Sequence, residues 1–141
     1  MKATIFLRIA SVLTFVHCVL HTIGGVFGSP SHGAEEVAVI ESMKSHRFAF
    51  MGSTRGYWDF FFGYGLFVSV SLLILAVLLW QLSALPKTSA GRIRPMLVVL
   101  CLGFLAFAII SWNYFFIAPT VVELLIALFI ALAFVTAPAS A

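Results

Sequence analysis

Residues 95–138 read PMLVVLCLGFLAFAIISWNYFFIAPTVVELLIALFIALAFVTAP and contain one charged residue, Glu123. A helix needs about 20 mostly apolar residues to cross a bilayer. The stretch contains two such runs, at about 95–116 and 119–138, which are separated by a tight turn at Pro119. It therefore predicts two consecutive transmembrane helices.

Two further apolar runs of sufficient length occupy about residues 4–27 and 57–82. In lipid every backbone polar group must be paired internally, and none of the runs shows the short period-2 pattern of a barrel strand. We therefore predict an all-α integral membrane protein, a single membrane domain over residues 1–141. Its four-helix transmembrane bundle would have one long outer loop, residues 28–56.

The composition supports this fold class. Apolar residues make up 62% of the 141 residues and charged residues 9%, whereas a soluble domain has about one quarter charged residues. A soluble globular protein and a disordered chain are both excluded. No stripe of Lys and Arg interleaved with aromatic residues is present, so the expected partner is the lipid bilayer and not a nucleic acid.

The distribution of basic residues predicts the orientation. With four spans, one face of the membrane receives five basic residues: Lys2, Arg8, Lys87, Arg92 and Arg94. The opposite face receives Lys44, Arg47 and Arg55, which three glutamates offset. Because Lys and Arg concentrate on the cytoplasmic side, we expect a cell-membrane protein with both termini cytoplasmic.

The outer loop is predicted to contain a short helix over residues 34–48. Val37, Ile40 and Met43 recur at a spacing of three, although charged residues fall on or beside the same face. We expect this partly amphipathic helix to lie on the outer surface or to cap the bundle.

Polar residues enter the predicted spans mainly in the outer half of the bilayer. His17 and His21 share one face of the first span, which also carries Gly24 and Gly25. Small residues of this kind allow a neighbouring helix to approach closely. Ionisable residues inside a span are costly and usually face the bundle interior.

The other three spans each place a polar residue at a similar depth: Asp59, Asn113 and Glu123. We call these three residues, together with His17 and His21, the polar layer. Each also has a structural interpretation, because Asp59 can cap its helix, Asn113 can join helices, and a helix N-terminus favours the Glu123 carboxylate.

The polar layer predicts a pocket that opens outward and binds an apolar small molecule such as a quinone, an isoprenoid or another lipid. Phenylalanines at 60–62 and 115–116 flank it, and an aromatic cleft with a few polar groups is typical of a small-molecule site. Two alternatives remain open: an accessory subunit of a larger membrane complex, and a metal-binding or proton-relay protein. No motif indicates catalysis or a cofactor, and assembly as a homo-oligomer or within a larger membrane complex stays open.

The two cysteines, Cys18 and Cys101, are predicted to be free thiols. Measured from one membrane face, they differ in depth by about 10 Å at 1.5 Å per residue. A disulfide requires Cα atoms within about 7 Å.

Two short motifs resemble the DoxX-like group of small bacterial four-span membrane proteins. One is the opening Phe6-Leu7-Arg8-Ile9 before the small and polar face of the first span. The other is Pro119, then Glu123, in a Leu- and Ala-rich helix. The motifs cover about a quarter of the chain, and the glutamate lies in the last span, which departs from the group. The resemblance implies a fold and no particular activity.

Overall fold

The computed structural model describes residues 2–30, 32–85 and 90–137. Within these ranges four helical segments are long and apolar enough to cross a membrane, namely Lys2–Val26, Tyr57–Ala84, Ile93–Tyr114 and Ile117–Thr136. They confirm the four predicted apolar helices to within a few residues. The predicted end of the fourth span at residue 138 lies outside the described residues, as does Lys87 of the charge argument.

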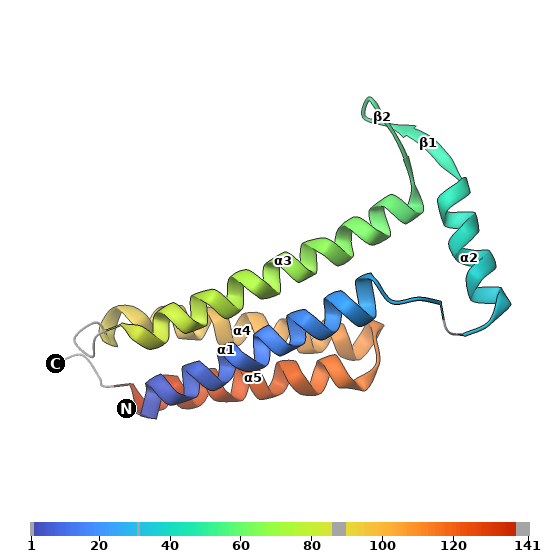
Figure 1. The fold of residues 1–141 in the computed structure, drawn as a ribbon. Helices are drawn as coiled ribbons and strands as arrows, with labels where there is room; N and C mark the ends of the chain where they lie inside the picture. Colours follow the sequence, from blue (N-terminus) through green and yellow to red (C-terminus); the bar gives the residue numbers. More distant parts are fainter. Residues whose placement is uncertain (1, 31, 86–89, 138–141) are drawn as a thin grey trace. The chain divides into compact units, whose positions relative to one another are not determined.

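The chain forms its elements in a simple order (Figure 1). The bounds are α1 Lys2–Leu20, η1 His21–Val26, α2 Ala34–Ser45, β1 Arg47–Phe50, β2 Ser53–Gly56, α3 Tyr57–Ala84, α4 Ala90–Tyr114 and α5 Ile117–Thr136. Element η1 is a π-helix that continues α1, and the Phe27 N–H donates to the Thr22 carbonyl at its end.

Two compact units make up the chain. Unit 1 is Met1–His17 together with Leu72–Ala141, and unit 2 is Cys18–Ser71. Helices α1 and α3 each contribute to both units, because the boundaries fall within them.

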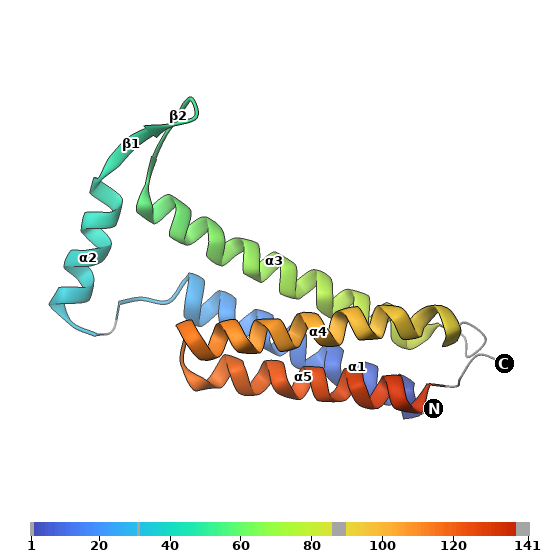
Figure 2. The same ribbon diagram turned by 180° about the vertical axis from the view of Figure 1, so that it is seen from behind.

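Unit 1 is a bundle of four helical segments. Its core takes Leu7 and Ala10 from α1, Leu79 from α3, Phe104 from α4 and Ile130 from α5, all of which are buried. Helices α4 and α5 run side by side in both ribbon views and are joined by a short turn (Figures 1 and 2). The start of α1 and the end of α5 lie at the same end of this unit (Figure 2).

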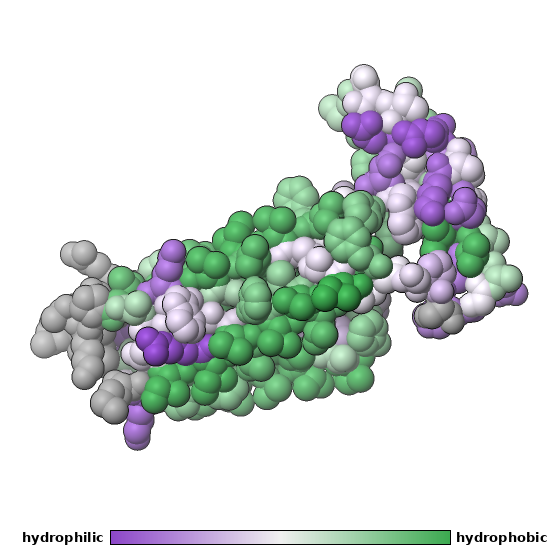
Figure 3. Space-filling view, in the orientation of Figure 1, coloured by the Kyte–Doolittle hydropathy of each residue, from purple (hydrophilic) through white to green (hydrophobic). Residues whose placement is uncertain are grey.

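Most of the apolar surface of the helices is not covered by other parts of the chain. Between 22% and 33% of the most apolar stretch of each segment is buried, so at least two thirds of each stretch lies outside the core. Figure 3 shows the surface of the helices as largely hydrophobic, whereas hydrophilic residues gather over α2 and the hairpin of unit 2. An apolar surface of this extent on a water-soluble monomer would be exceptional.

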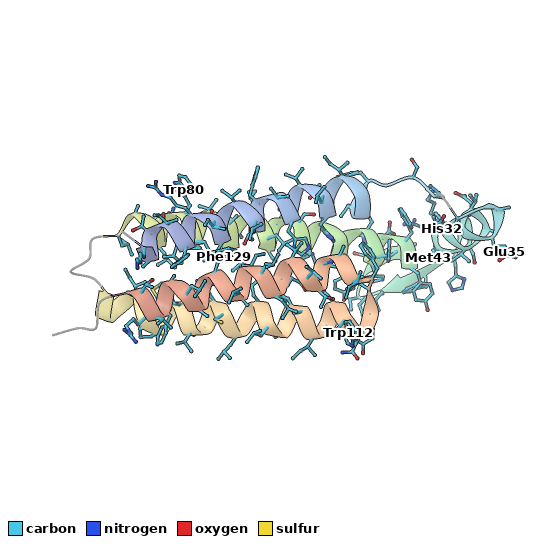
Figure 4. The ribbon with its side chains drawn as sticks, turned by 90° about the horizontal axis from the view of Figure 1, so that it is seen from below. His32, Glu35, Met43, Trp80, Trp112 and Phe129 are labelled. Atoms are coloured by element: carbon cyan, nitrogen blue, oxygen red, sulfur yellow. The ribbon has the colours of Figure 1, made fainter. Side chains whose placement is uncertain are left out.

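Aromatic and basic side chains mark the ends of unit 1. The Arg8 guanidinium lies 5.2 Å from the Trp80 ring centroid, and Trp80 and Trp112 project from opposite ends of the bundle (Figure 4). Arg94 donates to the Ala137 carbonyl at 3.3 Å and lies 4.3 Å from the Phe134 ring centroid. A cation at a helix C-terminus satisfies a carbonyl that lacks an intrahelical partner.

Helix α4 begins earlier than the sequence predicts. The prediction places the start of the third span at about Pro95, where the long apolar run begins. In the structure the helix begins at Ala90 and Pro95 lies inside it. By contrast, Pro119 lies in the first turn of α5, where proline is tolerated.

The predicted loop helix over residues 34–48 is wrong at its C-terminal end. Helix α2 ends at Ser45, and the chain then forms an antiparallel hairpin in which Arg47 pairs with Gly56 and Phe50 with Ser53. The two turn residues have positive φ angles, 49° at Met51 and 79° at Gly52. A two-residue turn of this type matches the twist of the strands, but it usually contains Asn-Gly, so the sequence signal is weak.

Candidate functional site

The buried face of α5 carries two polar residues near the N-terminus of the helix. Thr120 and Glu123 are each 5% exposed, and they begin a buried stripe that continues through Ile126, Ala127 and Ile130. The spacing of three or four residues keeps the stripe on one side of the helix. The Glu123 carboxyl group is therefore directed into unit 1 by the same periodicity that forms the core.

Helix α4 brings a third polar residue to this point. Ser111 is buried, and its side chain lies next to the Glu123 carboxyl group. We call Ser111, Thr120 and Glu123 the α4–α5 polar cluster. The cluster can form because the short turn after Tyr114 places the last turns of α4 beside the first turns of α5.

Two atoms of the α4–α5 polar cluster lack a protein partner. In the part of the chain that the structure describes, neither Glu123 Oε2 nor Thr120 Oγ1 has a hydrogen-bond partner, and both atoms are buried. Native proteins pair nearly all buried polar atoms, because an unpaired one costs about 1–3 kcal/mol. The two unpaired atoms lie about one helical turn apart on α5.

An open cleft of about 110 Å³ lies beside the cluster at the same end of unit 1. It is lined by Trp112, Phe115, Phe116, Ile117 and Thr120. Sites that enclose a whole drug-sized ligand measure about 300–1,000 Å³. This cleft therefore has room for a small polar head group, and the remainder of a larger ligand would extend along the exposed apolar surface.

The structure brings Ser111 to Glu123 where the sequence prediction placed Asn113. Asn113 is exposed, and its amide donates to the Ile109 carbonyl of its own helix at 2.7 Å. Side chains two residues apart on a helix point in directions that differ by about 200° around the helix axis, so Ser111 and Asn113 face nearly opposite sides. Phe104, Ala108 and Ser111 are buried and follow one another at spacings of four and three residues, so they share one face of α4. This spacing was the signal in the sequence that could have identified Ser111.

The remaining members of the polar layer are divided between the two units. His17 is half-buried in unit 1, whereas His21 and Asp59 belong to unit 2. The exposed Asp59 carboxylate accepts the Gly56 N–H at 2.8 Å and lies 3.5 Å from the Arg47 guanidinium. These contacts are those of a residue that caps the start of α3.

In unit 2, a polar seam joins α1 and η1 to α3. The Cys18 thiol donates to the Ser69 carbonyl at 3.2 Å, and the Thr22 hydroxyl donates to the Ser69 hydroxyl at 2.9 Å. His21 Nε2 lies 3.1 Å from the Gly65 carbonyl oxygen. Hydrogen bonds of this kind hold transmembrane helices together, and they account for His21 without a ligand.

The close approach in this seam occurs at a glycine other than those predicted. No atom beyond its own helix lies within 4 Å of a Cβ built on Gly24, and at Gly25 the nearest atoms belong to the His21 ring. A Cβ on Gly65 would lie 3.0 Å from Val26 Cγ2. The glycine that permits the close contact is therefore Gly65 of α3, whereas the prediction placed the small residues on the first span.

The described residues offer no metal site, since no three His, Cys, Asp or Glu side chains among them gather in a suitable way. Cys18 and Cys101 are both free, which confirms the predicted thiols. The metal alternative therefore lacks a ligand set in the described ranges.

Comparison with known proteins found no matching family model, no matching curated protein and no matching solved structure. The resemblance to the DoxX-like group stays a prediction.

Proposed function

We propose that the chain is a multi-pass membrane protein that binds an apolar small molecule through the α4–α5 polar cluster. The observation that carries the proposal is the pair of buried atoms, Glu123 Oε2 and Thr120 Oγ1, that lack partners in the described residues. A bound head group would supply the missing hydrogen bonds. The expected ligands remain a quinone, an isoprenoid or another lipid, now with a requirement for a hydroxyl group, which a quinone carries in its reduced quinol form.

The chemistry of the cluster supports a ligand with a small polar head. A carboxylate accepts hydrogen bonds, and a threonine hydroxyl both donates and accepts. A hydroxyl or quinol group can therefore satisfy Glu123 and Thr120 together. The aromatic lining at Trp112, Phe115 and Phe116 favours a flat or apolar portion next to that head.

The proposed orientation places the start of α1 and the end of α5 in the cytoplasm. Lys2, Arg8 and Arg94 support it, because they belong to that end of unit 1 and Lys and Arg concentrate on the cytoplasmic side. The α4–α5 polar cluster then lies towards the outer leaflet, where a lipid-like ligand can enter from the bilayer.

The proposal is tested by fluorescence quenching with a short-chain benzoquinol, the reduced form of a benzoquinone, whose hydroxyl groups can donate to the Glu123 carboxylate. A variant with Trp58→Phe and Trp80→Phe keeps Trp112 at the cleft as the one tryptophan. In detergent micelles we expect saturable quenching that farnesol or a monoacylglycerol reduces by competition. Glu123→Gln in this background should weaken quinol binding about tenfold, because loss of a hydrogen bond to a charged group costs about 1.5–3 kcal/mol.

Asn113→Ala is the matched control, because Asn113 lies on the same turn of α4 as the cluster but its amide bonds only within its own helix. It should leave quenching unchanged. Quenching that rises linearly with quinol concentration, or that is equal in the Glu123→Gln variant, contradicts the proposal. A defined heteromeric assembly without a bound small molecule in native mass spectrometry favours the accessory-subunit alternative instead.

A further inference from the structure

Two arginines of the hairpin in unit 2 converge on one backbone oxygen. Arg47 Nη2 donates to the Thr54 carbonyl at 3.1 Å, and Arg55 Nη1 donates to the same oxygen at 2.9 Å. The two nitrogens are therefore at most about 6 Å apart. Like charges this close repel each other, so the arrangement favours an anion that contacts both.

The hairpin register explains how the side chains meet. Phe50 and Ser53 close the two-residue turn, so the next pair, Ala49 and Thr54, is a pair without mutual hydrogen bonds. The Thr54 carbonyl then points away from β1, at the free edge of β2. Successive side chains alternate between the faces of a strand, so Arg47 and Arg55 reach this edge from opposite faces of the hairpin.

The charge at this edge is only partly offset. Asp59 lies 3.5 Å from Arg47 and balances one of the two guanidinium groups. The neighbouring Lys44 is paired with Glu41 at 3.1 Å. Arg47 is half-exposed and Arg55 is exposed, so each keeps N–H donors available to an external group.

The position of the hairpin in the chain indicates the source of the anion. Strand β2 ends at Gly56, and the candidate membrane span α3 begins at the next residue, Tyr57. Ring contacts hold the hairpin against the start of this span, with the Phe48 centroid 5.1 Å from Tyr57 and 6.2 Å from Phe60. The two guanidinium groups therefore lie next to the first turn of a membrane-crossing helix, at the level where lipid head groups are found.

We propose that Arg47 and Arg55 form a binding site for the phosphate group of an anionic phospholipid. Paired guanidinium groups match the oxygens of a phosphate with short, charge-assisted hydrogen bonds. The Thr54 carbonyl holds the two groups together in the absence of the lipid. The site uses residues of unit 2 alone and does not depend on the function proposed for Glu123.

The test measures lipid binding to the purified 141-residue protein by native mass spectrometry from detergent micelles. The probes are phosphatidylglycerol and a galactosyl diacylglycerol with the same acyl chains, which lacks the phosphate. The native protein should bind phosphatidylglycerol about tenfold more tightly than the galactolipid. Arg55→Gln and Arg55→Lys should each weaken phosphatidylglycerol binding about tenfold, because both lose the planar donor pair.

Lys44→Gln is the control, since it removes one positive charge from the same surface and should change binding less than about twofold. Arg55 is suited to substitution because its side chain bonds to the adjacent residue, Thr54, and circular dichroism of both Arg55 variants should match that of the native protein. Native-like binding by Arg55→Lys, or an equal loss in Lys44→Gln, would show diffuse attraction and overturn the site. Displacement of phosphatidylglycerol by millimolar inorganic phosphate would overturn the assignment to a lipid.

Discussion

Replacing Thr120 by valine should stabilise the protein. Thr120 is 5% exposed, and its hydroxyl has no hydrogen-bond partner in the described residues. Burial of an unpaired hydroxyl costs about 1–3 kcal/mol, and valine has nearly the same shape without the hydroxyl. In separated helices the hydroxyl can still find a partner, so we take the low end of this range. The expected gain is about 1 kcal/mol, or about fivefold in the folding equilibrium.

Thr14 supplies the matched control. It is fully buried, but its hydroxyl donates to the Ala10 carbonyl of its own helix at 2.8 Å. This bond persists when the helices separate, so Thr14→Val should change stability by less than about 0.5 kcal/mol. The comparison of the two variants isolates the contribution of the unpaired hydroxyl from the general effect of a Thr-to-Val change.

The assay is reversible unfolding in mixed micelles at rising sodium dodecyl sulfate, followed by circular dichroism for the native protein and both variants. A saturating benzoquinol should then reverse the order. A ligand at about 100 times its Kd stabilises the native protein by about 2.7 kcal/mol. The same ligand should stabilise the Thr120→Val variant less, because the variant lacks the hydroxyl that contacts the ligand. If Thr120→Val is destabilised by about 1 kcal/mol without ligand, the hydroxyl has a protein partner and the reasoning is refuted.

The remaining predictions concern the rest of the fold. Gly65→Ala should destabilise unit 2, because the new Cβ would lie 3.0 Å from Val26 Cγ2, and the SDS titration should show an earlier transition. Met51→Asn should stabilise the hairpin and Gly52→Ala should weaken it by about 1 kcal/mol, because both positions have positive φ angles; hydrogen exchange of the hairpin amides measures both, and equal protection in the two variants would contradict the turn assignment. Reporter fusions at the N- and C-termini should both be active in the cytoplasm, and activity of one fusion alone would contradict the proposed topology.

The four apolar helices follow from the sequence because their length and composition are local properties. A helix satisfies its own backbone hydrogen bonds, so a run of about 20 apolar residues is sufficient to predict it. The free thiols could also be predicted, since a difference in depth along helices depends only on the rise per residue. Glu123 was identified for the same reason, as the one charged residue in residues 95–138.

The loop between the first two spans was predicted only in part. Helix α2 was expected, but the hairpin at Arg47–Gly56 was not, because its turn has glycine at one position and methionine, 91% exposed, at the other. Methionine carries no preference for a positive φ angle. The hairpin is stabilised by the pairing of its two strands and not by local propensity. Because this pairing is a contact between two segments, the residues of either segment alone do not predict it.

The sequence by itself determined how many apolar helices form and which polar residues interrupt them. The tertiary structure decided which side of each helix is buried, and therefore that Ser111 and not Asn113 joins Glu123. The physical reason is that these helices are apolar around most of their circumference. In a soluble protein the polar face of a helix reveals its buried face, but a helix surrounded by lipid has no such face, so only the packing of its neighbours selects one.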